Sequence, residues 1–400
     1  TTEIYTLSLH DALPISELSK MSENKIINVA VLGCGSRGRG VTNNLLRDSK
    51  GNVKVLAVFD PDKAVAKETI EHWKQPDAKI CDSYQEAIDF PGVDWVMVFS
   101  PNAFHKEQIL AGFKAGKHVF SEKPLATAIE DCQEIFEAHK KSNVKFATGF
   151  VLRYAPLYRK AKEIITSGAI GRVLSIDANE NIAPSHGGYI MTNWRRHKEI
   201  AGPHILEKCC HDLDLINWFC DSLPSKVAAF GGLEFFKPEN AGMLKKYGEN
   251  MFMSWWDPHR ESDPFNSDKD LLDTQVAIVE YRNRIRVMFQ ATMSNAMPER
   301  RMYFSCTEGN MIVELYSSTL KLQKMGENMF TEYNFGADGH GGGDGYIMKE
   351  LYEGPMCTDE EPKCSGNEGL TSAVLALAMD RSACTNQIVD LEPVWKSMNR

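Results

Sequence analysis

The stretch "INVAVLGCGSRGRG", residues 27–40, decides the fold of this 400-residue chain. An apolar, β-branched run is followed by Gly33, Gly35 and Gly38 and then by the helix-compatible segment "VTNNLLRDS". This order predicts a strand, a tight turn and a helix. In GxGxxG spacing, Gly33 allows the turn, Gly35 lets a pyrophosphate approach backbone N–H groups, and Gly38 lets the helix pack on the strand.

A carboxylate after the next predicted strand indicates which dinucleotide binds. The run "VKVLAVFD" ends in Asp60, about 20 residues beyond the glycines, where a carboxylate can accept both hydroxyls of an adenosine ribose and repel a 2'-phosphate. NAD is therefore expected rather than NADP. Ser36 and Arg37 lie within the glycine-rich turn and are expected to contact the cofactor as well. A glycine turn followed by a solvated aspartate is the alternative interpretation.

Strands and helices continue to alternate up to residue 150. Further strands are predicted at "VDWVMVFSP", "KHVFSEKP" and "VKFATGFV", with helices at "HKEQILAGFKAG" and "AIEDCQEIFEAHKKS". The alternation predicts a doubly wound parallel sheet, a Rossmann domain over residues 21–149. Ligands bind at the carboxyl ends of such strands. The candidates there are Ser100, Asn102, His105, Glu122 and Lys123.

Residues 150–400 predict a second, α+β domain with an open and mainly antiparallel sheet for substrate binding, catalysis and oligomerisation. Its strands are expected in the runs "RVLSIDANE", "QVAIVEYRN", "RIRVMFQATM" and "RMYFSCTEGNMIVELY". Residues 236–270 lack a clear period and predict an insertion or a long functional loop.

The stretch "GPHILEKCCHDLDLINWFC", residues 202–220, predicts one helix that begins at Pro203. At about 100° per residue, one side carries a core stripe. That stripe comprises Leu206, Cys209, Leu213, Ile216 and Cys220. The other side carries His204, Glu207, His211, Asp214 and Trp218. The cysteines are therefore interpreted as packing residues and no metal is expected, because Glu207 and His211 alone are an incomplete ligand set. A solvated polar face is the other reading of the second side.

Four motifs together resemble the family of glucose-fructose oxidoreductase, inositol dehydrogenase and MocA. They are "VLGCGSRG", "EKPLATAIED", "HILEKCCHDLD" and "GLTSAVLALAMDRSA", and the likeness covers essentially the whole chain from Met21. The resemblance implies that Lys123 and His211 act on one sugar hydroxyl. The family's aspartate in the helix motif is Glu207 here, which is one methylene longer.

The resemblance implies NAD-dependent oxidation of a secondary hydroxyl of a sugar or glycoside, with C3 as the expected carbon. Removing hydride from a carbinol carbon requires the O–H proton to leave, and histidine titrates near neutrality, so His211 is assigned as general base and Lys123 as the donor that polarises the hydroxyl. Expected sugar contacts are Arg153, Tyr154, Trp194, Arg195, Arg196 and His197, together with His340 in the loop "DGHGGGDGYIM", which also holds Asp344.

Two other functions stay open. One is a redox-neutral glycoside hydrolase that oxidises C3 transiently, eliminates the C1 substituent, adds water and returns the hydride. It needs a further base, for which the sequence offers Tyr154, His186, Tyr189 and His340. The other is a regulatory NAD-binding protein without catalysis.

The composition restricts the class of partner and the cellular compartment that we expect. A net charge of -9 disfavours nucleic acid, and the ten irregularly spaced cysteines and the absence of a long apolar run indicate a reducing cytoplasm and no membrane anchor. We expect a homo-oligomer formed through the second sheet. Residues 1–20 are expected to be a non-native or disordered leader, because "TLSLHDALPI" resembles a translated sequencing adapter.

Overall fold

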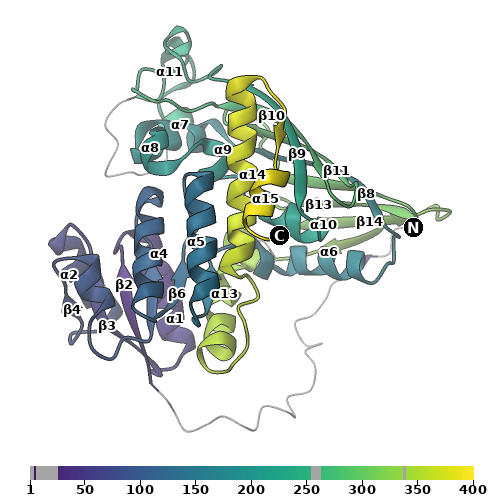
Figure 1. Ribbon diagram of the computed structural model, residues 1–400. Helices are drawn as coiled ribbons and strands as arrows, with labels where there is room; N and C mark the ends of the chain where they lie inside the picture. The colour runs from purple at the N-terminus through teal and green to yellow at the C-terminus, as the bar shows by residue number, and fades with distance from the viewer. Residues whose placement is uncertain (1–3, 6–25, 254–262, 337–338) are drawn as a thin grey trace.

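The structure is a computed structural model that describes residues 4–5, 26–253, 263–336 and 339–400. It contains a six-stranded and a ten-stranded sheet that lie side by side, with a long helix between them (Figure 1). This is the predicted α/β arrangement of a parallel sheet and a second, mainly antiparallel sheet, and the prediction is confirmed.

The six-stranded sheet is parallel throughout, in the order β4-β3-β2-β5-β6-β7. Its strands are β2 (Ile27–Leu32), β3 (Val53–Phe59), β4 (Lys79–Ile80), β5 (Trp95–Val98), β6 (His118–Ser121) and β7 (Phe146–Thr148). The order reverses between β2 and β5, so their carboxyl ends form the crevice in which such sheets bind ligands.

Helices cover both faces of this sheet because its strands are apolar on both sides. On one face lie α1 (Ser36–Asp48) and α2 (Lys63–Trp73), and on the other lie α3 (Tyr84–Ile88), α4 (His105–Lys114) and α5 (Ile129–Lys141). Val41 and Leu45 of α1 share one buried cluster with Val29 and Val31 of β2, whereas Ile109 of α4 belongs to the other. The parallel sheet, at whose edge the crevice lies, is therefore packed between two buried apolar clusters, one on each face.

The ten-stranded sheet has the order β1-β15-β14-β13-β12-β8-β11-β10-β9-β16. Its strands are β1 (Ile4–Tyr5), β8 (Val173–Asn181), β9 (Pro224–Gly232), β10 (Thr274–Tyr281), β11 (Arg286–Thr292), β12 (Arg301–Cys306), β13 (Gly309–Glu314), β14 (Thr319–Lys324), β15 (Thr331–Asn334) and β16 (Val389–Asp390). Only the β8–β11 and β1–β15 pairs are parallel among these strands. Apart from β1, residues 1–20 lie outside the described residues.

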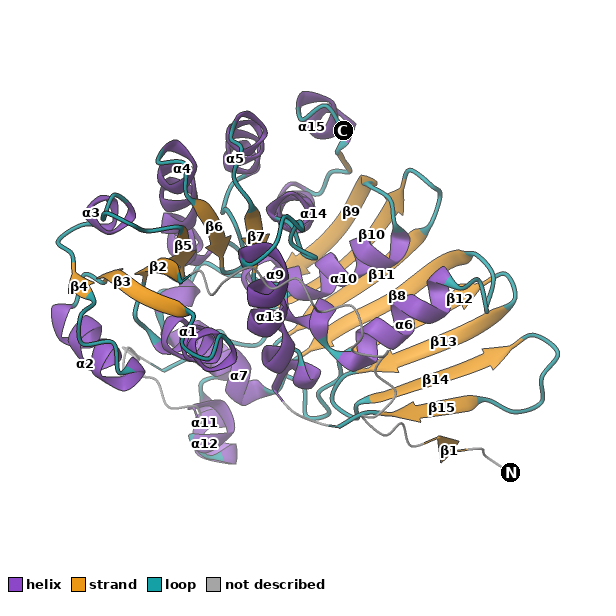
Figure 2. Cartoon of the chain, turned by 90° about the horizontal axis from the view of Figure 1, so that it is seen from below, coloured by secondary structure: helices purple, strands orange, loops and turns teal. Residues whose placement is uncertain are grey.

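Helices lie over one face of the large sheet, as Figure 2 shows for α6 (Pro156–Thr166) and α10 (Cys210–Cys220). The long helix α14 (Gly366–Thr385) packs against β9 and α10. The shorter helices are α7 (Pro184–Thr192), α8 (Lys198–Ala201), α9 (His204–Glu207), α11 (Gly242–Tyr247), α12 (Asn250–Met253), α13 (Asp344–Leu351) and α15 (Glu392–Ser397).

The C-terminal part of the chain returns to the parallel sheet. Ile347, Met348 and Leu351 of α13 join the buried cluster of α1 and β2, and the N–H of Thr148 donates to the carbonyl of Cys364. The first domain is therefore completed by residues far beyond 149, although the division of the chain at that residue stays a prediction.

The described residues of the expected insertion at 236–270 form a small cap of their own. α11 and α12 pack over α7 around the buried side chains of Phe236, Phe252 and Phe265. Residues 254–262 of this segment lie outside the described part of the chain.

The prediction of one continuous helix from Pro203 is wrong. The chain forms α9 and α10, and turns at Lys208 and Cys209 between them. The core stripe is buried as expected, but so is the opposite side, because His204, Glu207 and Asp214 face other parts of the protein. Charged and polar groups of the protein surround that side in place of water. The periodicity of hydropathy alone cannot show that a polar helix face is buried in this way.

Candidate active site

The glycine-rich turn leaves room for an anion above the start of α1. Gly33 has φ 95°, and a Cβ there would come within 2.7 Å of the backbone of Phe99. A Cβ on Gly38 would overlap the carbonyl of Gly33. Among the described residues, a Cβ on Gly35 would meet nothing within 4 Å, and no side chain caps the first N–H groups of α1. Free helix N–H groups facing open space fit a pyrophosphate.

Asp60 lies at the carboxyl end of β3, next to this turn. Its Oδ2 accepts from the N–H of Cys34 at 2.8 Å and its Oδ1 from the N–H of Asp62 at 2.9 Å. Each oxygen keeps a second lone pair, so the carboxylate can still accept from ribose hydroxyls. Asp60 therefore also holds the glycine-rich turn against β3.

Four more residues were expected at the strand ends besides Lys123. Three of them make contacts that stabilise loops, and the fourth, Glu122, pairs with the glycine-rich turn. Ser100 donates to Gln108, Asn102 donates to the carbonyl of Ala201, and both ring nitrogens of His105 lie against backbone carbonyls. These three side chains therefore brace the loops around the crevice. Glu122 is buried and pairs with Arg37 at 2.7 Å, which ties the glycine-rich turn to the Lys123 segment.

Lys123 and Glu207, both expected to act in catalysis, lie in contact. The Nζ of Lys123 donates to the backbone carbonyl of Glu207 at 2.8 Å and lies 4.0 Å from its Oε1. That carbonyl lies at the end of α9, where the helix is interrupted. Although burial raises the pKa of Glu207, the charges of Lys123 and Arg195 outweigh it and hold the pKa below its usual value. Glu207 thus stays ionised and fixes the lysine.

His211 lies in the first turn of α10 with only 3% of its surface exposed. Its ring contacts Phe150 edge-on at 5.7 Å, and its Nδ1 has no hydrogen-bond partner among the described residues. Burial, and then the charges of Lys123 and His340, hold the pKa of His211 well below its ordinary value. The imidazole is therefore neutral near pH 7, and a ring nitrogen is available to accept a hydrogen bond from a hydroxyl.

His340 lies directly beside His211, with ring centroids 5.7 Å apart. Its Nδ1 is 2.5 Å from Oδ2 of Asp344, and the other oxygen of that carboxylate accepts from Arg37 at 2.8 Å. The glycine-rich turn, the His340 loop and the start of α10 therefore converge. The sequence places Asp344 four residues after His340, a spacing that could have indicated this pair.

Arg195 lies on the same side of the site. Its Nε donates to Glu207 at 2.9 Å, its Nη1 donates to the hydroxyl of Tyr189, and its guanidinium stacks over Trp194 at 4.2 Å. Because Trp194 and Arg195 remain partly exposed around ionised Glu207, they offer a stacking face and donors for a polar ligand.

Four other expected sugar contacts lie elsewhere. Arg153 is buried, and its guanidinium donates hydrogen bonds to Asp214 and Glu368. The remaining three are Tyr154, which is buried under Arg159, and Arg196 and His197, which face Asp268. The structure does not bring these four side chains to Lys123 and His211.

A buried charged cluster behind the site had no counterpart in the sequence interpretation. Arg300 binds Asp212 with two hydrogen bonds of 2.8 and 2.7 Å and lies 3.2 Å from Glu180, whose Oε1 is 3.8 Å from Nζ of Lys208. Burial raises the pKa of Asp212 more than Arg300 lowers it, and Glu180 raises it further. No local pattern connects these residues, because they come from β8, the turn between α9 and α10, α10 itself and the segment before β12.

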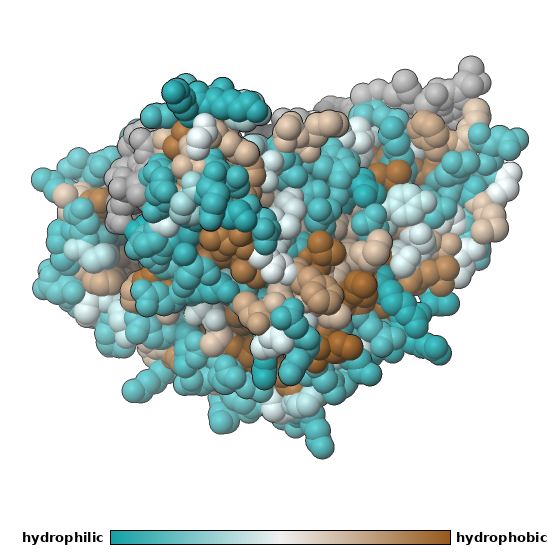
Figure 3. Space-filling model, turned by 90° about the horizontal axis from the view of Figure 1, so that it is seen from above, coloured by the Kyte–Doolittle hydropathy of each residue, from teal (hydrophilic) through white to brown (hydrophobic). Residues whose placement is uncertain are grey.

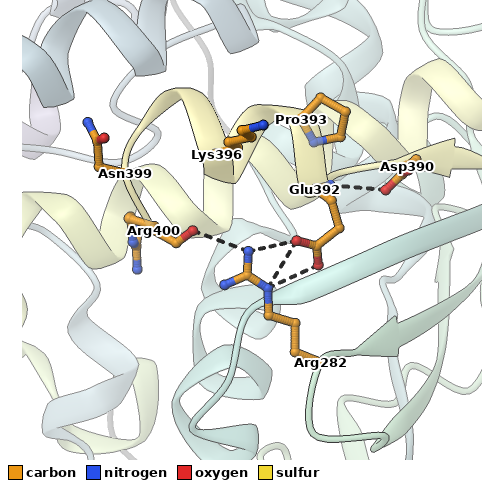
Figure 4. A pocket seen from close by; sticks show the side chains of 7 residues that line it. All are labelled: Arg282, Asp390, Glu392, Pro393, Lys396, Asn399 and Arg400. Carbon is orange, nitrogen blue, oxygen red and sulfur yellow. Dashed lines mark hydrogen bonds and ion pairs between the residues drawn. The ribbon is translucent and has the colours of Figure 1, made fainter.

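Neither a metal centre nor a membrane span is found among the residues that the structure describes. No group of three or more metal-ligating side chains gathers there, and no helix in that part of the chain is long and apolar enough to cross a bilayer. A hollow beside α15 is lined by Arg282, Glu392 and Lys396 and contains none of the expected site residues (Figure 4).

Comparison with known proteins gives the relatives of the chain. It is 25% identical over 369 residues to the oxidoreductase YteT of Bacillus subtilis, covering 80% of this chain and 86% of that protein. It is 32% identical over 199 residues to inositol 2-dehydrogenase of Gluconacetobacter diazotrophicus, covering 49% and 55%. It is 30% identical over 207 residues to 2,7-anhydro-N-acetylneuraminate hydratase of Escherichia coli, covering 52% and 53%, so these two matches span about half of each relative.

The fold agrees with these matches. A levoglucosan dehydrogenase in complex with NADH and levoglucosan superposes with a TM-score of 0.74 at 20% identity, covering 92% of this chain and 99% of that one. Residues 27–150 match the description "Oxidoreductase family, NAD-binding Rossmann fold", and residues 158–312 match "GFO/IDH/MocA C-terminal domain". The chain therefore belongs to the GFO/IDH/MocA family of NAD-binding oxidoreductases, as its motifs predicted.

Proposed function

We propose that this protein oxidises a secondary hydroxyl of a sugar or glycoside, at C3, with NAD as hydride acceptor. The observation that carries the proposal is the contact between Lys123 and Glu207, four residues before the buried His211, whose pKa the charge of Lys123 helps to lower. A neutral histidine and a lysine beside one ionised carboxylate form a proton-transfer group that a regulatory protein would not need.

The residues of the glycine-rich turn fit the cofactor. Open space at Gly35 and the uncapped start of α1 would hold the pyrophosphate, and Asp60 would accept the ribose hydroxyls. Ser36 and Arg37 would flank the phosphates. NAD, when bound, would supply the nicotinamide ring that accepts the hydride.

In this proposal Lys123 donates a hydrogen bond to the substrate oxygen and lowers the cost of negative charge on it. His211 accepts the hydroxyl proton as the C–H bond breaks. Glu207 positions Lys123, and Arg195 and Trp194 contact the ring of the sugar. The expected contacts Arg153 and Tyr154 have no part in it, because their side chains are buried elsewhere.

The redox-neutral hydrolase is the second candidate. A relative named as a hydratase supports it, and so does a second imidazole in the site. Of the four further bases, Tyr154 is buried beneath Arg159, and burial lowers the pKa of His186 to about 2. Tyr189, whose hydroxyl accepts from Arg195, and His340 are the remaining candidates.

One experiment separates these functions. The purified protein is incubated with NAD and a panel of levoglucosan, myo-inositol and nitrophenyl glycosides, while reduced cofactor and released nitrophenol are both followed. Stoichiometric cofactor reduction supports the dehydrogenase, and nitrophenol release without net reduction supports the hydrolase. Neither signal with any sugar would contradict the proposal and leave the regulatory protein.

We also propose a homo-oligomer formed through the uncovered face of the large sheet. Phe230, Val276, Ile278 and Met288 are between 48% and 69% exposed, and the strand register makes Val276 a neighbour of Phe230 and Ile278 a neighbour of Met288. Figure 3 shows the molecule from above, where hydrophobic residues lie in separate patches among hydrophilic ones. Size-exclusion chromatography of Ile278→Lys tests this, since a charge in the interface should yield monomers.

A cytoplasmic location is proposed on the state of the thiols. All ten cysteines are free, and eight of them are buried. Free thiols persist in a reducing compartment. Fractionation of the producing cells with activity assays in each fraction tests the location.

A further inference from the structure

Two imidazoles of different exposure meet in the site. His211 is almost fully buried, whereas the side chain of His340 is 33% exposed. Their ring centroids are 5.7 Å apart and their planes are inclined by 45°. A proton accepted by His211 must leave before the next turnover, and His340 is the neighbouring imidazole that reaches solvent.

The backbone holds His340 in an unusual conformation to place it there. Its φ and ψ are 49° and 39°, and Gly341 and Gly342 also have positive φ values. A non-glycine residue in the left-handed region is uncommon and carries a conformational cost. A Cβ on Gly343 would overlap the carbonyl of Val151, so the loop is packed tightly and presents the imidazole in a fixed direction.

Asp344 orients the ring. Its carboxylate contacts Nδ1 of His340, and burial raises its pKa less than His340 and Arg37 lower it, to about 2. The carboxylate is therefore ionised near neutrality and accepts the hydrogen on Nδ1, which makes Nε2 the basic nitrogen.

We propose that His340 receives the proton that His211 takes from the substrate and passes it to solvent, with Asp344 as its positioning residue. The inference rests on the proposed function. The hydroxyl proton forms an N–H bond on His211 as the hydride leaves the carbon. It then moves, directly or through one water, to Nε2 of His340, and from there to bulk water. Burial disfavours charged His211, so it gives up the proton readily.

The test uses rapid mixing of the complete protein with NAD and the panel sugar that it oxidises fastest, in weak buffer. His340→Gln should keep the first turnover of cofactor reduction within about twofold, because His211 still accepts one proton. Steady-state turnover should fall on the order of 10-fold, which is less than the roughly 100-fold or more that a group transferring a proton in the chemical step contributes. Added imidazole should restore it. Asp344→Asn should give a smaller loss with the same rescue, and His72→Gln on the exposed face of α2 is the matched control.

Each other outcome counts against the relay. An equal loss in the first turnover would place His340 in the hydride step, and a raised KM with unchanged kcat would make it a sugar contact. A steady-state loss that imidazole does not restore would also overturn the relay, provided that thermal unfolding shows both variants folded. If the unaltered protein reduces NAD with no sugar of the panel, the proposed function itself fails and the relay fails with it.

Discussion

Replacing Arg153 with methionine should destabilise the protein without weakening sugar binding. Arg153 makes hydrogen bonds of 2.6 and 2.8 Å to Asp214, whose side chain has no exposed surface, and one of 2.5 Å to Glu368. The methionine fills a similar volume but leaves the Asp214 carboxylate unpaired in the interior. Breaking a buried ion pair in this way costs about 3–5 kcal/mol.

The cost should depend on pH. Burial, which outweighs the attraction of Arg153, raises the pKa of Asp214 to about 6. A raised carboxyl pKa means that the folded state holds its proton more tightly than the unfolded chain, so the stability from this group is lost as pH rises through about 6. Without Arg153 the pKa rises further. The variant should therefore lose little at pH 5 and most at pH 8.

Thermal unfolding followed by circular dichroism measures the effect. For a chain of this length that unfolds as one unit, 3–5 kcal/mol corresponds to a fall in Tm of about 4–6 °C. Adding Asp214→Leu should recover most of the loss at pH 8, because the unpaired charge is gone. An unchanged Tm together with a raised KM would refute this reasoning and return Arg153 to the sugar site.

Four further changes test other parts of the site. His211→Asn should keep the fold and cut turnover on the order of 100-fold, whereas Cys209→Ala should lower Tm and leave turnover per folded molecule nearly intact. Kinetics and thermal unfolding of the two proteins check this, and a collapse of turnover in the cysteine variant would contradict it. Asp60→Ala should weaken NAD binding by about 1.5–3 kcal/mol and reduce discrimination against NADP, as titration calorimetry with both cofactors would show. Gly38→Ala should abolish cofactor binding or folding, since its Cβ would overlap the carbonyl of Gly33; normal NAD affinity would show that α1 can shift.

The N-terminal half was predictable because its signals are local. Strand and helix periods place β2, α1 and β3, and Gly33, Gly35 and Asp60 follow at fixed spacing. The family motifs likewise indicated Lys123 and His211. These residues lie at strand ends or helix starts, where position in the sequence determines position in the fold.

The remaining errors come from contacts between distant segments. Arg153 and Arg195 look alike as basic residues near aromatic ones, yet one meets Asp214 in the interior and the other meets Glu207 in the site. The break at Lys208 could not be predicted from an apolar stripe that is periodic across it. Charge pairing between separate segments of the second domain decides the two arginine cases, and one sequence does not contain it.

The packing of α13 on α1 determines the order in which the protein can be completed during synthesis. Residues 27–150 leave the ribosome long before Ile347, Met348 and Leu351, which belong to the same apolar cluster as Val29 and Val31. Until then one side of the nascent Rossmann domain has an uncovered apolar surface, which a chaperone would have to shield. A fragment that ends near residue 150 should therefore aggregate, and joining it to a tethered copy of residues 339–365 should restore a soluble, NAD-binding unit.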